Sequence, residues 1–230
     1  MSGISAALSL VFAGDGALYA IVRLSLIVTL SAVAIAGLIG LPLGAALALT
    51  RFPGRQALVV LLNACMGLPP VVVGLAVFLL LSRSGPLGPL GLLFTPQAMV
   101  IAQAILVTPI IAALTRQTIE DLWFVYRDEL TAMDISPLRR VSALLWDARF
   151  SLVTILLAGF GRAAAEVGAV MIVGGNIDGF TRMMTTAIAL ETSKGDLPLA
   201  LGLGLVLIAI VIAVNALAWG ARRVGERHAG

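Results

Sequence analysis

Arg162 and Glu166 are oppositely charged residues four positions apart inside an apolar stretch. Their types and spacing suggest either an ion pair or a site that guides an anion. Positions four apart share one face of a helix. With a rise of 1.5 Å per residue, Arg162 lies about 18 Å along a helix from Phe150, near the centre of a bilayer. An unpaired charge at that depth costs at least about 2.5 kcal/mol, so the two are predicted to pair. Two roles remain open. A structural pair is favoured, because the carboxylate cancels the field that an anion would feel, and the alternative is an anion guide.

Most other kinds of site have no residues to build them. Cys65 is the only cysteine and His228 the only histidine, so neither a His/Cys metal site nor a Ser-His-Asp or Cys-His nucleophile set can be assembled. The G-x-x-x-x-G-K-[ST] phosphate loop is missing, and the single lysine, Lys194, precedes Gly195 and Asp196. The sequence therefore predicts no catalytic residue, metal or cofactor, and any nucleotide hydrolysis must belong to a partner.

The composition places these residues in a membrane. Hydrophobic residues make up 60% of the 230 positions and charged residues 12%, against about 25% charged in an ordinary soluble domain. The mean hydropathy is +1.08. The fifteen basic residues are spread over short loops, which argues for a loop-charge bias rather than a nucleic-acid surface.

Five apolar segments are long enough to cross a hydrocarbon core of about 30 Å. Only the fourth is charged, through the Arg162 and Glu166 pair. Glycines and prolines in the first segment, and Pro69-Pro70 in the second, indicate close helix packing and kinks. We predict a single all-α membrane domain over residues 1–230, with spans at about 24–49, 57–82, 96–115, 150–173 and 197–220.

The two ends of the chain are predicted to lie on opposite sides of the membrane. Ile4 to Phe12 lack the basic flank of a signal peptide, and we expect a short interfacial helix there. Lys and Arg number ten on one side and four on the other, which predicts an outside N-terminus and a cytoplasmic C-terminus. The ten are Arg51, Arg55, Arg116, Arg127, Arg139, Arg140, Arg149, Arg222, Arg223 and Arg227, and the four are Arg23, Arg83, Arg182 and Lys194.

The connector over residues 116–149 carries a second pattern. Apolar residues recur at helical spacing from Ile119 to Met133, which predicts an amphipathic helix that continues the third span. Ser136-Pro137 is typical of an N-cap followed by the first residue of a further helix. Apolar anchors beside mixed charge suit a groove-binding helix, although a solvated helical hairpin would show the same pattern.

The part of this connector from Asp128 to Arg149 resembles the EAA loop of ABC importer permeases, the helix-turn-helix by which such subunits contact their ATPase. The copy departs from the pattern: Asp128-Glu129-Leu130 stands for Glu-Ala-Ala, Asp134 for glycine, and Asp147 where proline is common. The resemblance implies a coupling helix and an ATPase contact at Asp128, Glu129, Leu130, Met133, Asp134, Ser136, Pro137, Arg139 and Arg140.

The outer connectors extend the resemblance over nearly the whole chain. Residues 161–169, followed by Gly174-Gly175-Asn176-Ile177 and Thr181-Arg182, are similar to molybdate, sulfate and tungstate permeases. Residues 66–74, 84–88 and 185–196 are more specifically similar to the tungstate branch. Five spans also fit this branch, because molybdate permeases typically have one more. A helix is expected between Thr181 and Ser193 as a re-entrant segment. Gly174, Gly175, Asn176, Thr181 and Arg182 are expected along the translocation path.

The resemblance implies the inner-membrane permease of an oxyanion importer, most closely a tungstate importer, with a molybdate-permease-like fold. It also implies a homodimer, a cytoplasmic ATPase and an extracytoplasmic oxyanion-binding protein as partners. Molybdate and sulfate permeases remain the alternatives within the class. An intramembrane enzyme is disfavoured, because only Arg162 and Glu166 are available at depth, and a non-transporting scaffold would need no re-entrant connector.

Overall fold

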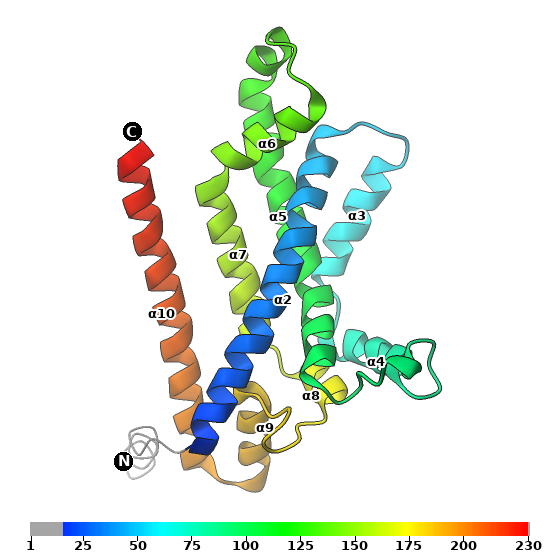
Figure 1. The fold of residues 1–230 in the computed structure, drawn as a ribbon, viewed down its shortest axis with the longest axis vertical. Helices are drawn as coiled ribbons and strands as arrows, with labels where there is room; N and C mark the ends of the chain where they lie inside the picture. Colours follow the sequence, from blue (N-terminus) through cyan, green and yellow to red (C-terminus); the bar gives the residue numbers. More distant parts are fainter. Residues whose placement is uncertain (1–15, 230) are drawn as a thin grey trace. The chain divides into compact units, whose positions relative to one another are not determined.

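The computed structural model describes residues 16–229, and the side chains of all of these except residues 17, 137, 138 and 221–229. The predicted interfacial helix over residues 4–12, the side chains of Arg222, Arg223 and Arg227, and that of His228 therefore lie outside the described part. Every regular element from residue 16 to residue 229 is helical, as the predicted fold class requires (Figure 1). The elements are α2 (Gly16–Leu49), α3 (Arg55–Met66), α4 (Pro70–Leu81), the 3₁₀ turn η1 (Gly88–Leu90), α5 (Pro96–Ala132), α6 (Pro137–Asp147), α7 (Arg149–Ala164), α8 (Gly168–Gly174), α9 (Met184–Lys194) and α10 (Leu197–Ala229).

The described chain forms two compact units. The first contains residues 16–32, 69–103 and 161–229, and the second contains residues 33–68 and 104–160. The long helices α2 and α5 each contribute residues to both units, as does α7 with its last turn.

Three helices in the described part are long and apolar enough to cross a membrane, and the number of crossings rises to at most five if each of two bent helix pairs counts as one. The three are Leu18–Leu49, Pro96–Ala132 and Leu197–Gly220. The number of five spans stays a prediction.

The predicted second span is broken into two separate helices rather than kinked. It consists of α3 and α4, two helices of twelve residues, each about 18 Å long and too short to cross alone. Pro69 and Pro70 explain the break, because a residue before proline is disfavoured in the helical region. Pro69 has φ −62° and ψ 122°, and Pro70 then occupies the first position of α4.

The predicted fourth span is likewise not one helix. It ends as α7 at Ala164 and resumes as α8 at Gly168, so Glu166 lies in the break rather than on a helical face. The expected helix end at Gly174 and Gly175 is confirmed, because Gly175 adopts φ 71° after the last residue of α8.

Small residues bring helices close together within each unit. In the second unit, a Cβ on Gly44 of α2 would lie 2.8 Å from the Cβ of Thr115 in α5, so only glycine allows this approach. In the first unit, a Cβ on Gly74 of α4 would lie 2.7 Å from the Cα of Ala169 in α8. The close packing predicted for the glycines of the first apolar segment is therefore present.

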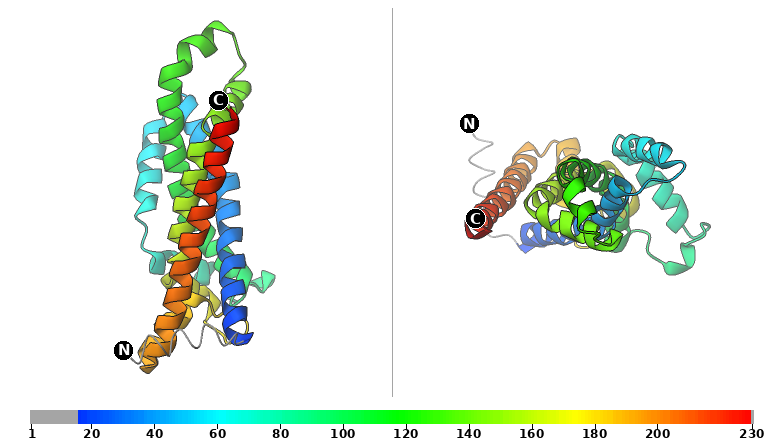
Figure 2. Two further views of the ribbon diagram at one scale, coloured as in Figure 1. Left: turned by 90° about the vertical axis from the view of Figure 1, so that its left-hand side faces the viewer. Right: turned by 90° about the horizontal axis from the view of Figure 1, so that it is seen from above.

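The predicted cytoplasmic helix is continuous with the third span, since α5 runs unbroken to Ala132 (Figure 2). A short turn leads from it to α6, which begins at Pro137 with Ser136 as its N-cap residue, as expected. The axes of α6 and α7 then differ by 75°.

Candidate functional site

The ion pair between Arg162 and Glu166 stabilises the break between α7 and α8. Arg162 Nη1 lies 2.6 Å from Glu166 Oε2, and the second carboxylate oxygen, Oε1, accepts the backbone N–H of Ala169 at 3.0 Å. The two side chains differ in burial, at 32% exposure for Arg162 and 3% for Glu166. Glu166 therefore neutralises Arg162 and also satisfies a donor at the start of α8. An arginine already paired in this way has less charge to offer to a passing anion.

Two uncharged side chains satisfy carbonyl groups that the broken helix leaves free. Gln103 of α5 donates from Nε2 to the carbonyl of Ala163 at 3.1 Å, and Thr185 of α9 donates from Oγ1 to the carbonyl of Glu166 at 2.8 Å. Both residues are buried. Backbone groups without hydrogen-bond partners are costly at membrane depth, so the two side chains stabilise the break by pairing with its carbonyl groups. Neither residue was among the predicted site residues. The available signal for Gln103 was a polar residue inside an apolar segment, whereas Thr185 lies outside the five predicted spans.

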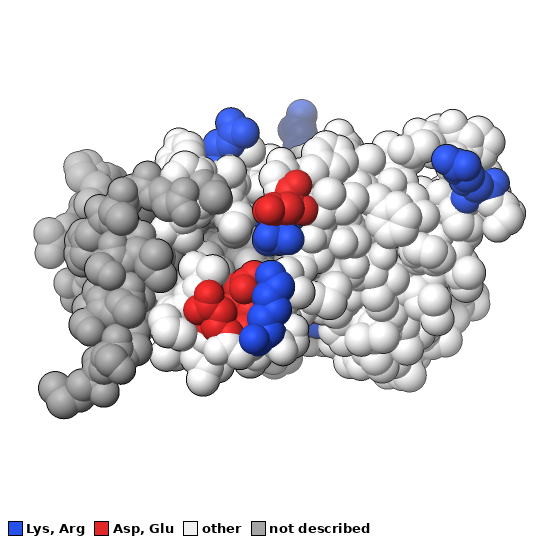
Figure 3. All heavy atoms as spheres, turned by 90° about the horizontal axis from the view of Figure 1, so that it is seen from below, with Lys and Arg blue, Asp and Glu red and all other residues white. Residues whose placement is uncertain are grey.

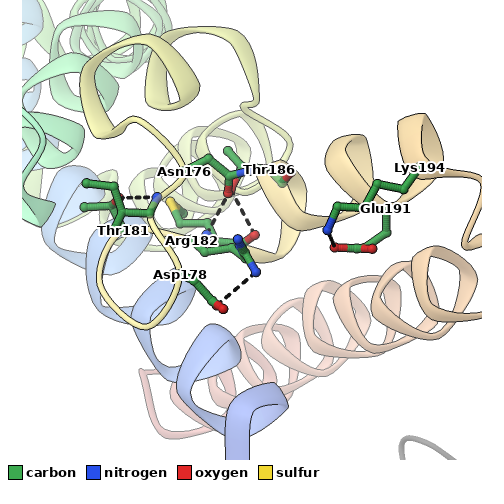
Figure 4. Close-up of polar contacts among 9 residues, drawn as sticks. Asn176, Asp178, Thr181, Arg182, Thr186, Glu191 and Lys194 are labelled. Atoms are coloured by element: carbon green, nitrogen blue, oxygen red, sulfur yellow. Dashed lines mark hydrogen bonds and ion pairs between the residues drawn. The ribbon is translucent and has the colours of Figure 1, made fainter.

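The loop from Gly174 to Thr181 is closed by Thr181 itself (Figure 4). Its hydroxyl donates to the carbonyl of Gly174 at 2.6 Å and accepts the N–H of Ile177 at 2.9 Å. Gly175 and Asn176 both have positive φ, 71° and 50°, which turns the chain back after α8. Four of the five predicted path residues thus belong to one ordered turn.

Arg182, the fifth path residue, is bound to Asp178, with 2.9 Å between Nη1 and Oδ1 (Figure 4). Asn176 lies nearby in the same loop, where Nδ2 is 3.5 Å from the carbonyl of Thr186. Two buried atoms, Arg182 Nε and Asn176 Oδ1, have no partner in the described part of the chain. Seen from below, the acidic side chains near the middle of the face lie next to basic side chains, and other basic side chains stand apart from one another (Figure 3). These groups offer no unpaired cluster of cations.

The helix expected between Thr181 and Ser193 is present as α9, and a buried serine anchors its first residue. The N–H of Met184 donates to Ser25 Oγ of α2 at 2.8 Å, and the hydroxyl of Ser25 donates to the carbonyl of Ile21 at 2.8 Å. Gly195, with φ 85°, ends the helix. Thr185 connects this helix to the α7–α8 break, so the connector over residues 174–196 and the charged pair form one polar region of the first unit.

The predicted coupling segment lies in the second unit as a helix-turn-helix. Asp134 has φ 46°, the left-handed conformation expected where the family pattern has glycine. Arg140 donates from Nε to the carbonyl of Ile135 at 2.7 Å and lies 5.9 Å from the centroid of the Trp123 ring, which ties α6 to α5. Met133 and Asp128 remain highly exposed, at 70% and 91%. The segment therefore presents one apolar and several charged side chains without an intramolecular cover.

Three charged side chains, which the sequence did not predict as a cluster, connect α5 to the helices beside it before the coupling segment begins. Glu120 of α5 is paired with Arg55 of α3 and with Arg116 of its own helix, and Arg55 Nε also donates to the carbonyl of Leu47 at 2.8 Å. The cluster joins the ends of α2 and α3 to α5 twelve residues before α5 ends. Spacing alone predicts the Arg116–Glu120 pair, but the contact over 65 residues to Arg55 has no local signal.

No group of three or more metal-binding side chains occurs within residues 16–229 as described. The ionisable side chains near the α7–α8 break pair with one another, and the remaining donors satisfy the backbone. Such an arrangement fixes how the helices on either side of the break are oriented.

The chain is similar to permease proteins over nearly its full length. It is 42% identical over 210 residues to the "probable anion ABC transporter permease protein" of Haloferax volcanii, covering 89% of this chain and 90% of the relative. It is 40% identical over 217 residues to the "tungstate uptake system permease protein" of Peptoclostridium acidaminophilum, covering 94% and 95%. A sulfate transport system permease protein of Synechococcus elongatus is 27% identical over 74% of this chain and 62% of its own length. No family model matches the chain.

Proposed function

This chain belongs to the family of ABC transporter permeases, and on that premise we propose that it forms the membrane path of an oxyanion importer whose cargo is tungstate. The observation that carries the proposal is the 40% identity over 94% of the chain to a tungstate uptake permease. The weaker similarity to sulfate permeases makes sulfate the second candidate. The chain is a transporter subunit, and its ATP hydrolysis is supplied by a partner.

The proposed assembly is a homodimer of this permease with two cytoplasmic ATPase subunits and an extracytoplasmic binding protein. The coupling residues Asp128 to Arg140 contact the ATPase, and the loop over residues 174–182 borders the path. Two features support these roles, namely the uncovered helix-turn-helix at Asp134 and the ordered turn closed by Thr181.

Cargo selection follows from the charges along the path. A desolvated dianion in a low dielectric carries a Born cost of tens of kcal/mol, and the paired Arg162 and Arg182 do not offset it. The anion therefore keeps its hydration shell as it crosses the membrane, and the permease binds it only weakly. Tungstate and molybdate are tetrahedral dianions of similar size, so fine discrimination needs directed donors and falls to the binding protein.

Uptake into sealed vesicles tests this function. Vesicles that contain the permease, its ATPase and its binding protein are expected to accumulate radiolabelled tungstate with ATP, at least tenfold above vesicles without the ATPase. Excess molybdate and sulfate serve as competitors. Accumulation of sulfate but not tungstate would assign the second candidate. Equal uptake with and without the ATPase would contradict an ATP-driven path.

The membrane topology is proposed as five spans with the N-terminus outside and the C-terminus in the cytoplasm. Reporter fusions after Gly54, Gly88, Asp128 and Gly195 are expected to report inside, outside, inside and outside. The physical reason is the ten-to-four distribution of Lys and Arg between the two sides. A cytoplasmic signal from the fusion after Gly195 would require a different number of crossings, because it would move α9 to the other side.

A further inference from the structure

Two amide side chains lie on one exposed face of α3, the helix that opens the broken second span. Gln56, Val60 and Asn63 are four and three positions apart, so they share this face, which we call the amide face. All three residues are exposed. Neither amide forms a hydrogen bond with any residue that the structure describes. The amide face therefore needs hydrogen-bond partners from outside the described chain.

Asn63 lies deep in the membrane in the proposed topology. Arg55, the first residue of α3, is paired with Glu120 at the end predicted to be cytoplasmic. Asn63 follows Arg55 by eight residues, which is about 12 Å along the helix. Half of a hydrocarbon core of about 30 Å is about 15 Å. The Asn63 amide is therefore close to the centre of the bilayer, where lipid offers no hydrogen-bond partner.

Asn215 of α10 shows how an exposed amide can be satisfied by its own helix. Its Nδ2 donates to the carbonyl of Val211, four residues earlier, at 2.8 Å. The equivalent carbonyl for Asn63 is that of Val59, and the described structure contains no such bond. Asn63 thus keeps its full hydrogen-bonding capacity for groups outside α3.

The large apolar side chains of α3 lie on a different face. Leu58 and Leu61 are three positions apart and are 46% and 58% exposed. At 3.6 residues per turn, Leu61 is about 160° around the helix from Asn63. Lipid suits this leucine face, whereas the amide face requires a polar neighbour. The two faces of α3 therefore meet two different kinds of surroundings.

Water satisfies the amide face better than a second copy of this chain does. A carboxamide has two donors and two acceptor lone pairs. When two amides face each other across a two-fold axis, each uses one donor and one lone pair, so half of its capacity is left over. Water occupies all four positions. Gln56 continues the polar line from Asn63 toward the cytoplasmic end of α3, so water that enters there reaches Asn63 along this face.

We propose that the amide face of α3 lines the hydrated path and that Asn63 donates hydrogen bonds to the oxyanion and its water shell at the centre of the membrane. This inference rests on the proposed function and adds a residue that contacts the cargo. The amide carries no net charge, so it supplies donors along the path without trapping a dianion. This agrees with a permease that binds its cargo only weakly.

Cysteine labelling tests whether water reaches the amide face. In a Cys65→Ser background, Val60→Cys places a thiol on the amide face and Leu61→Cys places one on the leucine face. The two positions are matched, because Val60 and Leu61 are both 58% exposed in the chain. A negatively charged methanethiosulfonate reagent reacts with thiolates, which form in water and not in lipid. In membrane fragments open on both sides, Val60→Cys is expected to be labelled at least tenfold faster than Leu61→Cys.

Equal labelling of the two variants, or labelling of neither, would overturn the hydrated face. A disulfide between copies at Val60→Cys, without labelling, would assign the amide face to a second copy and would overturn it as well. Labelling needs neither ATP nor cargo. Absent uptake by the wild type would therefore contradict the proposed function, whereas the labelling result would still decide whether the face is hydrated.

Asn63→Leu tests the contact with the anion, because it removes the amide at nearly constant size. Tungstate uptake into vesicles with the ATPase and the binding protein is expected to fall at least fivefold. The melting temperature is expected not to fall, since Asn63 has no partner to lose in the described fold. Asn215→Leu, the same replacement on the exposed amide of α10, is expected to retain uptake. Unchanged uptake by Asn63→Leu would overturn the anion contact, and so would lost uptake with a lowered melting temperature, which would make Asn63 structural.

Discussion

Replacing Arg162 with glutamine is expected to destabilise the folded permease by about 3–5 kcal/mol, because it leaves the buried carboxylate of Glu166 without its counter-charge. Glu166→Gln is expected to cost less, about 1–3 kcal/mol. The remaining arginine is one-third exposed, and a glutamine oxygen can still accept the N–H of Ala169. The double variant is expected to be more stable than Arg162→Gln alone. Thermal unfolding of the detergent-purified variants measures all three.

Asp178→Asn is the matched control for these variants. It breaks the Arg182 ion pair, but Asp178 is 78% exposed, and exposed pairs contribute about 0–1 kcal/mol. A wild-type melting temperature for Arg162→Gln, together with lost uptake, would instead identify Arg162 as an anion guide.

Exchanging the two charges is not expected to restore stability. If the carboxylate were only a counter-charge, the variant Arg162→Glu with Glu166→Arg would recover the wild-type melting temperature. At position 166, however, the side chain must also accept the backbone N–H of Ala169. Arginine has five donors and no acceptor, so the amide would lose its partner. Full recovery would show that the bond to Ala169 contributes little.

The fold was predictable from local patterns, whereas the polar region was only partly so. Hydropathy and charge identified the apolar segments, and Ser136-Pro137 identified the start of α6. The break after Ala164 was not predicted, because the residues from Gly161 to Gly168 other than Arg162 and Glu166 are apolar or small, and the four-residue spacing of these two charges is also that of a continuous helix. The break is stabilised by Gln103 and Thr185, which are distant in sequence. Such contacts depend on tertiary packing, and no spacing rule along the chain reports them.

The proposed ATPase contact predicts the second large effect. Glu129→Lys combined with Asp134→Asn is expected to leave the permease inserted but to lower ATPase co-purification at least tenfold and uptake to background. The reason is that charges at a docking surface are arranged to complement the partner, and like charges in contact cost several kcal/mol. Glu129 lies beside the exposed apolar anchor Met133, so its reversal acts at the centre of the proposed contact.

The choice of asparagine at position 134 separates charge from backbone strain. Asp134 has φ 46°, and most side chains would cost about 1–2 kcal/mol in this left-handed conformation, whereas asparagine adopts it as readily as aspartate. Asp121→Lys is the control for the reversal at Glu129, because it makes the same two-unit charge change as Glu129→Lys on an exposed residue of α5 outside the proposed contact. It is expected to retain both the ATPase and uptake. If Glu129→Lys with Asp134→Asn also retains both, the contact must lie elsewhere on the permease. If Asp121→Lys loses the ATPase as well, the contact extends up α5 toward the cluster at Glu120.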